Sequence, residues 1–232
     1  RPIAPNPQAL ALDRAQVAAI ENQAPFVRAR ELLLASLTDA ARAEWRFGQE
    51  ALPAPARAQA IHVAAKWGWY QQAVATATGE RVFNDYALLY PRPYDAEVAT
   101  GALLANLPPS YIYGVIRQES LYQSDAVSSA NARGLMQMLL DTASRTARRF
   151  EQPVPTAVSL FDPAVNVTLG AAHLRELVDR FDGQWPMALA GYNAGPNAAQ
   201  RWRPKHEMDP DIWIENIPFN ETRNYVQRIH WH

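Results

Sequence analysis

The sequence contains no cysteine among its 232 residues, which excludes thiol catalysis and disulfide bonds. It also lacks any apolar run close to the roughly 18 residues that a membrane-spanning helix needs. Lysine is scarce, and the net charge of -1 indicates neither nucleic acid nor an anionic membrane as a partner. What remains is a chain that is 48% hydrophobic, which is enough for one large or two small folded domains.

Signatures of metal and cofactor sites are missing as well. The histidines are scattered, apart from His230 and His232 near the end of the chain, so their spacing predicts no metal site. No GxSxG or SxxK motif presents a serine nucleophile, and no glycine-rich loop could cradle a phosphate. The sequence therefore predicts an activity without metal or cofactor.

Short helical patterns run through the whole chain. Proline and glycine interrupt them repeatedly, and no segment shows the alternation of a β-strand. This pattern predicts an all-α fold. We expect residues 1–95, which start with an extended proline-rich stretch, to be a helical linker at the end of an α-superhelical domain. Residues 96–232 then form a second helical domain.

Three side chains are predicted to cap helix N-termini. Thr38 and Asp141 each precede a helical pattern, and Asp162 is followed by a proline at the first helical position. A polar, proline-containing connection is expected over residues 197–211, before a last helix that follows Asn220.

Aromatic residues gather in the first domain, with Trp45, Trp67, Trp69 and Tyr70 close in the sequence. They could form a sugar-stacking platform. They could equally pack between helices, and we favour packing because aromatic side chains dominate core burial.

Glu119 is the most unusual residue of the second domain. It continues the apolar helical stripe of Ile112, Val115 and Ile116, so the sequence predicts an acid on a buried face. Burial and the nearby helix C-terminus both disfavour the charged form and should raise its pKa. A raised pKa suits a general acid, although a buried acid can also serve in a structural pair.

Three blocks of sequence resemble the signature of the soluble lytic transglycosylases of the lysozyme-like superfamily. The first is Glu119-Ser120 with Ser128 and residues 134–137, Gly-Leu-Met-Gln. The second is Ala-Gly-Tyr-Asn-Ala-Gly-Pro over residues 190–196, and the third runs from Ile217 to Val226. Each block is weak alone, but their common order and spacing are specific. The upstream residues 67–70 and 84–94 also resemble the linker domain of the large periplasmic members.

The resemblance implies a lysozyme-like α-helical catalytic domain with Glu119 as its only catalytic acid and base. Glu119 would protonate the oxygen between N-acetylmuramic acid (MurNAc) and N-acetylglucosamine (GlcNAc) in peptidoglycan. It would then accept a proton from the MurNAc C6 hydroxyl, which closes a 1,6-anhydro ring. The residues that match positions of the sugar-binding groove are Ser128, Met136, Gln137, Tyr192, Asn193 and Glu221.

The resemblance also implies context. Peptidoglycan glycan strands are the expected partner, and the periplasm is the expected location. A signal peptide and a further superhelical domain would precede residue 1. The chain departs from the family pattern at Leu139 and Leu140, where the family usually has Met and Pro, and at Asn131 and Gly191, where it often has Gly and Ala.

Two other functions remain open at this point. A goose-type lysozyme would hydrolyse the same bond with water. A glycan-binding scaffold without catalysis would use the helical linker and would not need Glu119.

Overall fold

The structure is a computed structural model that describes residues 8–230. Residues 1–7, most of the stretch predicted to be extended, and the terminal His232 lie outside the described residues. Within residues 8–230 all regular secondary structure elements are helices, which confirms the predicted all-α class. No helix within residues 8–230 is long and apolar enough to cross a membrane. Two compact units are present, Arg1–Pro91 and Arg92–His232.

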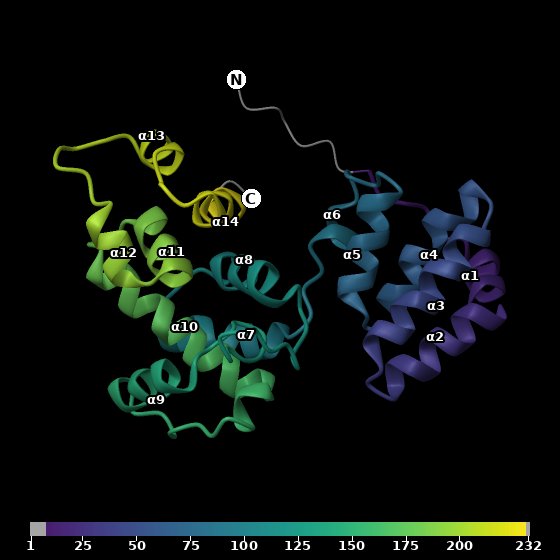
Figure 1. Cartoon of the computed structure of the whole chain (residues 1–232), viewed down its shortest axis with the longest axis horizontal. Coiled ribbons are helices and arrows are strands. Elements are labelled where there is room, and N and C mark those ends of the chain that lie inside the picture. Colours follow the sequence, from purple (N-terminus) through teal and green to yellow (C-terminus); the bar gives the residue numbers. More distant parts are fainter. Residues whose placement is uncertain (1–7, 231–232) are drawn as a thin grey trace. The chain divides into compact units, whose positions relative to one another are not determined.

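The first unit is a set of short paired helices (Figure 1). Its elements are α1 (Arg14–Glu21), α2 (Ala24–Leu34), α3 (Thr38–Ala51), α4 (Ala54–Lys66), α5 (Tyr70–Gly79) and α6 (Tyr86–Leu89). The helix α2 packs against α3, and α4 against α5, while α1 also covers α4. Pro25 and Pro55 stand in the first turns of α2 and α4, where a missing backbone N–H costs nothing.

A cluster of aromatic residues lies in the core of the first unit. Trp45 is 1% exposed and lies edge-on to Phe26, Trp67 and Trp69, with ring centroids 5.1, 5.5 and 5.6 Å away. Edge-to-face contacts of this kind stabilise a packed interior. The packing interpretation therefore accounts for Trp45, and its buried indole leaves no face for stacking a sugar.

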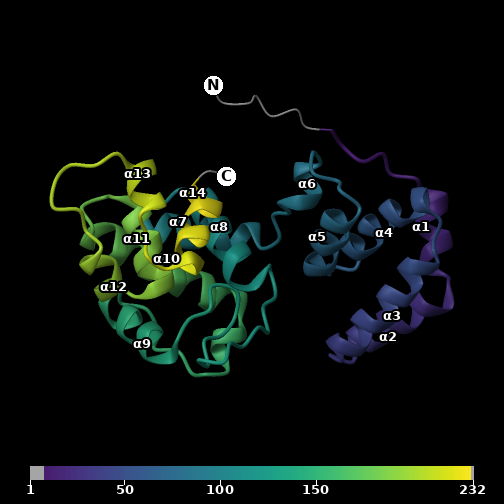
Figure 2. The ribbon, with the colours of Figure 1, turned by 45° about the horizontal axis from the view of Figure 1, so that its top comes forward.

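The second unit is built around one long helix, α10 (Pro163–Arg180) (Figure 2). The helices α7, α9 and α11 pack against α10, while α14 packs on α8, α11 and α13. The bounds are α7 (Asp95–Ala105), α8 (Pro109–Ser120), α9 (Leu140–Arg149), η1 (Ser159–Phe161), α11 (Trp185–Ala194), α12 (Pro196–Arg201), α13 (Pro210–Glu215) and α14 (Asn220–His230).

One of the three predicted caps is confirmed. The Asp162 carboxylate accepts a hydrogen bond of 2.8 Å from the backbone N–H of Ala164 at the start of α10. Thr38 and Asp141 were wrong as caps. Each lies inside the first turn of its helix, behind a leucine that makes no side-chain cap bond. At Asp141 the carboxylate still favours the positive end of the helix dipole.

The predicted polar connection over residues 197–211 is partly helical. Pro196 starts α12 and Pro210 starts α13, so both prolines open helices. The sequence prediction took Pro196 as the end of the preceding helix and Pro210 as part of the connection, because a proline can stand either just after a helix or at the start of one.

Candidate active site

The end of α8 positions Glu119. Ile112, Val115 and Ile116 are fully buried on its core face, as the sequence predicts. After Ser120 the helix stops, because Leu121 and Tyr122 both take positive φ angles, 48° and 68°. Glu119 therefore stands in the last turn of α8, at the edge of the core.

A tight loop faces this helix end. Residues 127 and 133, and residues 133 and 138, form two isolated antiparallel bridges that fold the chain back on itself twice. Gly134 has a φ of 75°, and a Cβ added there would lie 2.3 Å from the Leu160 carbonyl oxygen. Only glycine fits that position, which explains the Gly of the Gly-Leu-Met-Gln motif.

Asn166 of α10 holds this loop from beneath. Its side chain is fully buried and makes three hydrogen bonds to backbone groups. The Nδ2 group donates to the carbonyls of Arg133 and Leu160, both at 2.8 Å, and Oδ1 accepts from the Met136 N–H at 2.7 Å. A buried amide with all these bonds satisfied fixes the loop on the core.

Ser128 and Gln137 come from this loop. The hydrogen bonds that each side chain makes leave one group free to bind a ligand, an oxygen on Gln137 and a proton on Ser128. Gln137 Nε2 donates to the carbonyls of Ala126 and Gly134 at 3.1 and 2.9 Å, which uses both amide protons. Its carbonyl oxygen Oε1 is left to accept from a ligand. Ser128 Oγ accepts from the Ala132 N–H at 3.1 Å and keeps its own proton to donate.

The helices α11 and α14 complete the site. At the end of α11, Asn193 Oδ1 accepts a hydrogen bond of 2.7 Å from the buried Thr222 hydroxyl of α14. The Asn193 amide nitrogen is thereby left as a donor. The helix α14 lies close to α8, since a Cβ added at Gly114 would be 2.8 Å from Ile229 Cγ2.

These elements enclose a cleft of about 380 Å³. It brings together the predicted Glu119, Ser128, Gln137, Asn193 and Glu221, from four separate segments of the chain. The residues that line it and were not predicted are Gln118, Asn224, Tyr225 and Arg228.

Glu119 is the acid with a strongly raised pKa in this cleft. Burial raises the pKa of its carboxyl from 4.5 to about 7, the Tyr225 hydroxyl opposes the rise, and the negative charge of Glu221 adds to it. The sequence argument named burial and the helix C-terminus as causes of a raised pKa; burial is the largest cause in the structure, and the contribution of Glu221 was not predicted. Glu119 is thus poised to hold and release a proton near neutral pH.

Tyr225 is buried against Glu119. Its hydroxyl is close enough to lower the Glu119 pKa, yet its geometry completes no hydrogen bond with any described residue. The pKa of Tyr225 is raised well above its usual range by burial and by the charge of Glu119. Tyr225 therefore stays protonated and can donate to the carboxylate when Glu119 gives up its proton.

A family model for the transglycosylase SLT domain matches residues 99–214, which is half of the chain. The chain belongs to the SLT transglycosylase family. A second family model, for the soluble lytic murein transglycosylase L domain, matches residues 19–85 in the first unit. The resemblance given by the three sequence blocks is confirmed.

Relatives of this SLT family member are longer proteins. The chain is 32% identical to a putative soluble lytic murein transglycosylase of Haemophilus influenzae and 28% identical to the soluble lytic murein transglycosylase of Escherichia coli. These matches cover 82% and 88% of the chain, but in each case 32% of the relative. The chain spans about a third of the length of these relatives.

Solved structures agree with the fold. Lytic transglycosylase Slt of Pseudomonas aeruginosa, an inactive variant with a glutamate changed to glutamine, matches 98% of the chain at 31% identity and a TM-score of 0.88. The match covers 37% of that structure. The 70 kDa soluble lytic transglycosylase of Escherichia coli matches 94% of the chain at 27% identity and a TM-score of 0.82. This match covers 36% of the Escherichia coli structure.

Met136 and Tyr192 are not among the residues that line the cleft of this SLT domain, although Tyr192 lies near enough to Glu119 that burial and the charge of that acid together raise its pKa. Met136 is fully buried, and its sulfur packs where a Cβ at Gly170 would lie. The Tyr192 hydroxyl donates its one proton to the Met136 carbonyl at 2.8 Å and lies 3.4 Å from the Met138 sulfur. Both residues support the loop from behind. Apolar or aromatic character in a motif does not distinguish groove from core, so the sequence alone could not separate these roles.

Leu139 and Leu140, the departures from the family pattern, lie at the start of α9. They are 44% and 38% exposed and do not line the cleft. Gly191, another departure, sits against Phe181, whose ring would be 2.9 Å from an added Cβ. The small residue lets that ring pack closely.

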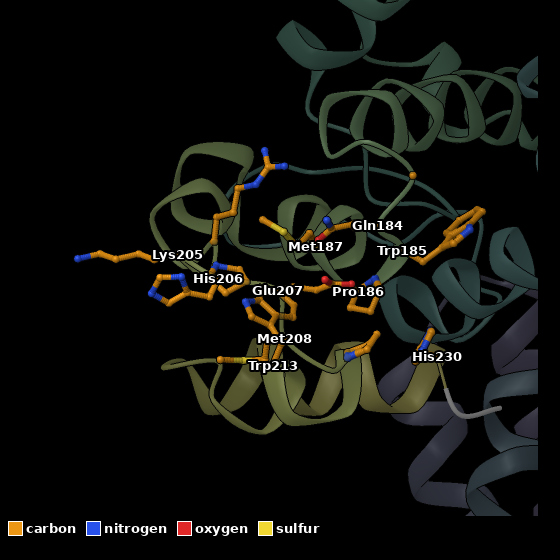
Figure 3. Close-up of a pocket in the computed structure, with 14 residues that line it drawn as sticks. Gln184, Trp185, Pro186, Met187, Lys205, His206, Glu207, Met208, Trp213 and His230 are labelled. Atoms are coloured by element: carbon orange, nitrogen blue, oxygen red, sulfur yellow. The ribbon is translucent and has the colours of Figure 1, made fainter.

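A larger cavity, of about 780 Å³, lies at the other ends of α11 and α14 (Figure 3). Trp185, Pro186 and Trp213 give it apolar walls. Among the described residues that line it, Glu207 is the only carboxylate, and Glu207 is exposed. The smaller cleft, with Glu119, is therefore the candidate active site. Among residues 8–230 no cluster of side chains could hold a metal ion.

Proposed function

We propose that the chain is the catalytic and linker part of a peptidoglycan lytic transglycosylase. The observation that supports this most directly is Glu119. It is an acid with a pKa of about 7, at the end of an apolar helix, in a cleft lined mostly by uncharged hydrogen-bonding groups. Such a lining suits a polyhydroxylated ligand.

In the first step, protonated Glu119 donates its proton to the glycosidic oxygen between MurNAc and GlcNAc. The bond from C1 of MurNAc to that oxygen breaks, and GlcNAc leaves with a free C4 hydroxyl. Burial of Glu119 is what keeps the proton available near neutral pH. Tyr225 then faces a newly formed carboxylate.

In the second step, Glu119 accepts the proton of the MurNAc C6 hydroxyl while O6 bonds to C1. This closes the 1,6-anhydro ring and regenerates protonated Glu119, so no water is consumed. One residue performs both transfers. The proposal assigns hydrogen bonds to sugar groups to Ser128, Gln137 and Asn193, and keeps Met136 and Tyr192 as residues that support the loop.

Hydrolysis by a goose-type lysozyme mechanism is the second candidate. The observation that favours it is Glu221, a carboxylate that lines the same cleft and could orient a water. A retaining glycosidase usually has a second carboxylate about 5–5.5 Å from its acid. Asp125, the nearest acid downstream of Glu119, is exposed and does not line the cleft.

The first unit fits the role of linker. We propose that residues 1–95 connect the catalytic domain, residues 96–232, to a further part of a longer protein that acts on glycan strands in the periplasm. The match of residues 19–85 to the L domain supports this division.

Product analysis tests the proposal. Purified sacculi are digested with the chain, and the glycan ends are analysed by mass spectrometry. A transglycosylase leaves 1,6-anhydro ends, which are one water lighter than reducing ends. Reducing ends alone would establish the hydrolase instead.

A further inference from the structure

The helix α14 presents a continuous polar stripe to the cleft. Glu221, Asn224, Tyr225 and Arg228 all line it, and their spacing of three, four and seven residues puts them on one face of the helix. At 1.5 Å per residue the stripe is about 10 Å long. One end is acidic, the other is basic, and Tyr225 beside Glu119 lies between them.

Arg228 has no partner that explains its position. Among the described residues it makes no hydrogen bond and no ion pair, and its side chain is exposed at the rim of the cleft. Arg223 of the same helix behaves differently, since its guanidinium donates to the Ile217 carbonyl at 3.1 and 2.8 Å. The helix dipole favours a cation in the last turn of α14, but it does not require one that faces the cleft.

Arg228 is the only cation among the residues that line the cleft within residues 8–230. The uncharged lining groups suit the hydroxyl and acetamido groups of a sugar. A guanidinium is suited instead to a carboxylate, which it binds through two parallel hydrogen bonds. Of the two sugars of peptidoglycan, the muramyl sugar carries such an acid, on its lactyl arm or on the peptide attached to that arm.

We propose that Arg228 is a specificity-determining residue that binds a carboxylate carried on the lactyl arm of the muramyl sugar. This rests on the proposed function, because it takes peptidoglycan as the ligand of the Glu119 cleft. It distinguishes muramyl-containing strands from a neutral glucosamine polymer such as chitin.

The carboxylate has two possible sources, and they exclude each other on any one sugar. In a strand without peptides the lactyl arm ends in a free carboxylate. In a strand with peptides that carboxyl is an amide, and the acids belong to the peptide. Substrates of each kind, prepared from sacculi with and without amidase treatment, therefore separate the two sources.

The test compares Arg228→Gln with the wild type on both substrates. Loss of a charge-assisted bond should raise KM about tenfold on the strand that supplies the carboxylate. The change in kcat should stay below about twofold, because Arg228 does not act on the acid. Arg228→Lys keeps the positive charge but lacks the planar guanidinium, so its KM should lie between those of the wild type and Arg228→Gln.

Arg201→Gln is the matched control. Arg201 is exposed in the last turn of α12 and does not line the cleft. Its replacement by Gln removes one positive charge, as Arg228→Gln does, but at a site away from the substrate. It should leave KM unchanged on both substrates. If Arg228→Gln changes KM no more than Arg201→Gln does, or lowers kcat alone, the proposal is wrong.

Binding separates this inference from the proposed function. The dissociation constants of both strands are measured in the Glu119→Gln background, with and without Arg228→Gln. About tenfold weaker binding to one strand supports the carboxylate contact even if the wild type leaves only reducing ends. Equal binding overturns it even if the wild type leaves anhydro ends.

Discussion

Glu119 combines two properties that the sequence gives separately, a place on an apolar stripe and a place at a helix end. Both were readable before the structure, because periodicity and the following loop residues are local signals. Tyr225 was not. It belongs to the third sequence block, but its contact with Glu119 arises only when α14 packs on α8, some hundred residues apart in the chain.

The raised pKa of Glu119 predicts a cost in stability above neutral pH. Between about pH 4.5 and pH 7 the folded chain keeps a proton that the unfolded chain has released, so the free energy of unfolding falls as pH rises through this range. The loss amounts to about 3 kcal/mol once pH exceeds 7. The Glu119→Gln variant should not show this loss, because the glutamine side chain does not ionise.

Denaturation of Glu119→Gln and wild type at two pH values measures this effect. The variant should be the more stable protein at pH about 8, and the difference should disappear at pH about 4. A difference that is the same at both pH values would mean that Glu119 is not protonated at neutral pH in the fold.

Tyr225→Phe tests the hydroxyl beside the acid. The hydroxyl lowers the Glu119 pKa, so its removal should raise that pKa further. The acid would then stay protonated to higher pH. The alkaline limb of the pH–rate profile for cleavage, near pH 7 in the wild type, should move upward in the variant. An unchanged or lowered limb would contradict the view that the Tyr225 hydroxyl stabilises the carboxylate.

At the scale of elements, the loop over residues 126–138 is what sets the site. Its glycine is a readable signal, since a Gly before apolar residues marks a special backbone. The clamp from Asn166 is not readable, because an asparagine in the middle of a helix has no sequence pattern that reveals a buried role. The cap that was predicted correctly, Asp162, is an acid before a proline, but the same pattern at Asp209 starts α13 and was not predicted.

Gly134→Ala should damage this loop severely. The new Cβ would meet the Leu160 carbonyl oxygen at 2.3 Å and Asn166 Nδ2 at 2.4 Å, at a φ of 75° that alanine rarely adopts. We expect a loss of at least about 3 kcal/mol in unfolding free energy, and loss of cleavage.

Gly79→Ala in α5 is the control, because nothing lies within 4 Å of its added Cβ. It should leave both stability and cleavage close to wild type. If Gly134→Ala is as mild as Gly79→Ala, the loop does not have the close approach described here.

At the scale of the whole molecule, the two units have separate cores. The tryptophan cluster belongs to the first, and the helices around α10 to the second. The helical class was predictable from the short helical patterns and the lack of strand alternation. The internal arrangement of each unit was not, because short helices of similar composition can pair in several ways.

Trp45→Ala should therefore destabilise the first unit selectively. Removing a fully buried tryptophan costs about 3–5 kcal/mol. Calorimetry should show one melting transition move to lower temperature while a second stays in place. A single transition that shifts as a whole would indicate that both units unfold together.

The central claim is that Glu119 drives closure of a ring without consuming water. The most direct measurement digests sacculi in water labelled with heavy oxygen and analyses the products by mass spectrometry. The account predicts 1,6-anhydro ends without label from the wild type, and no new ends from Glu119→Gln. Labelled reducing ends from the wild type, or undiminished cleavage by Glu119→Gln, would contradict it.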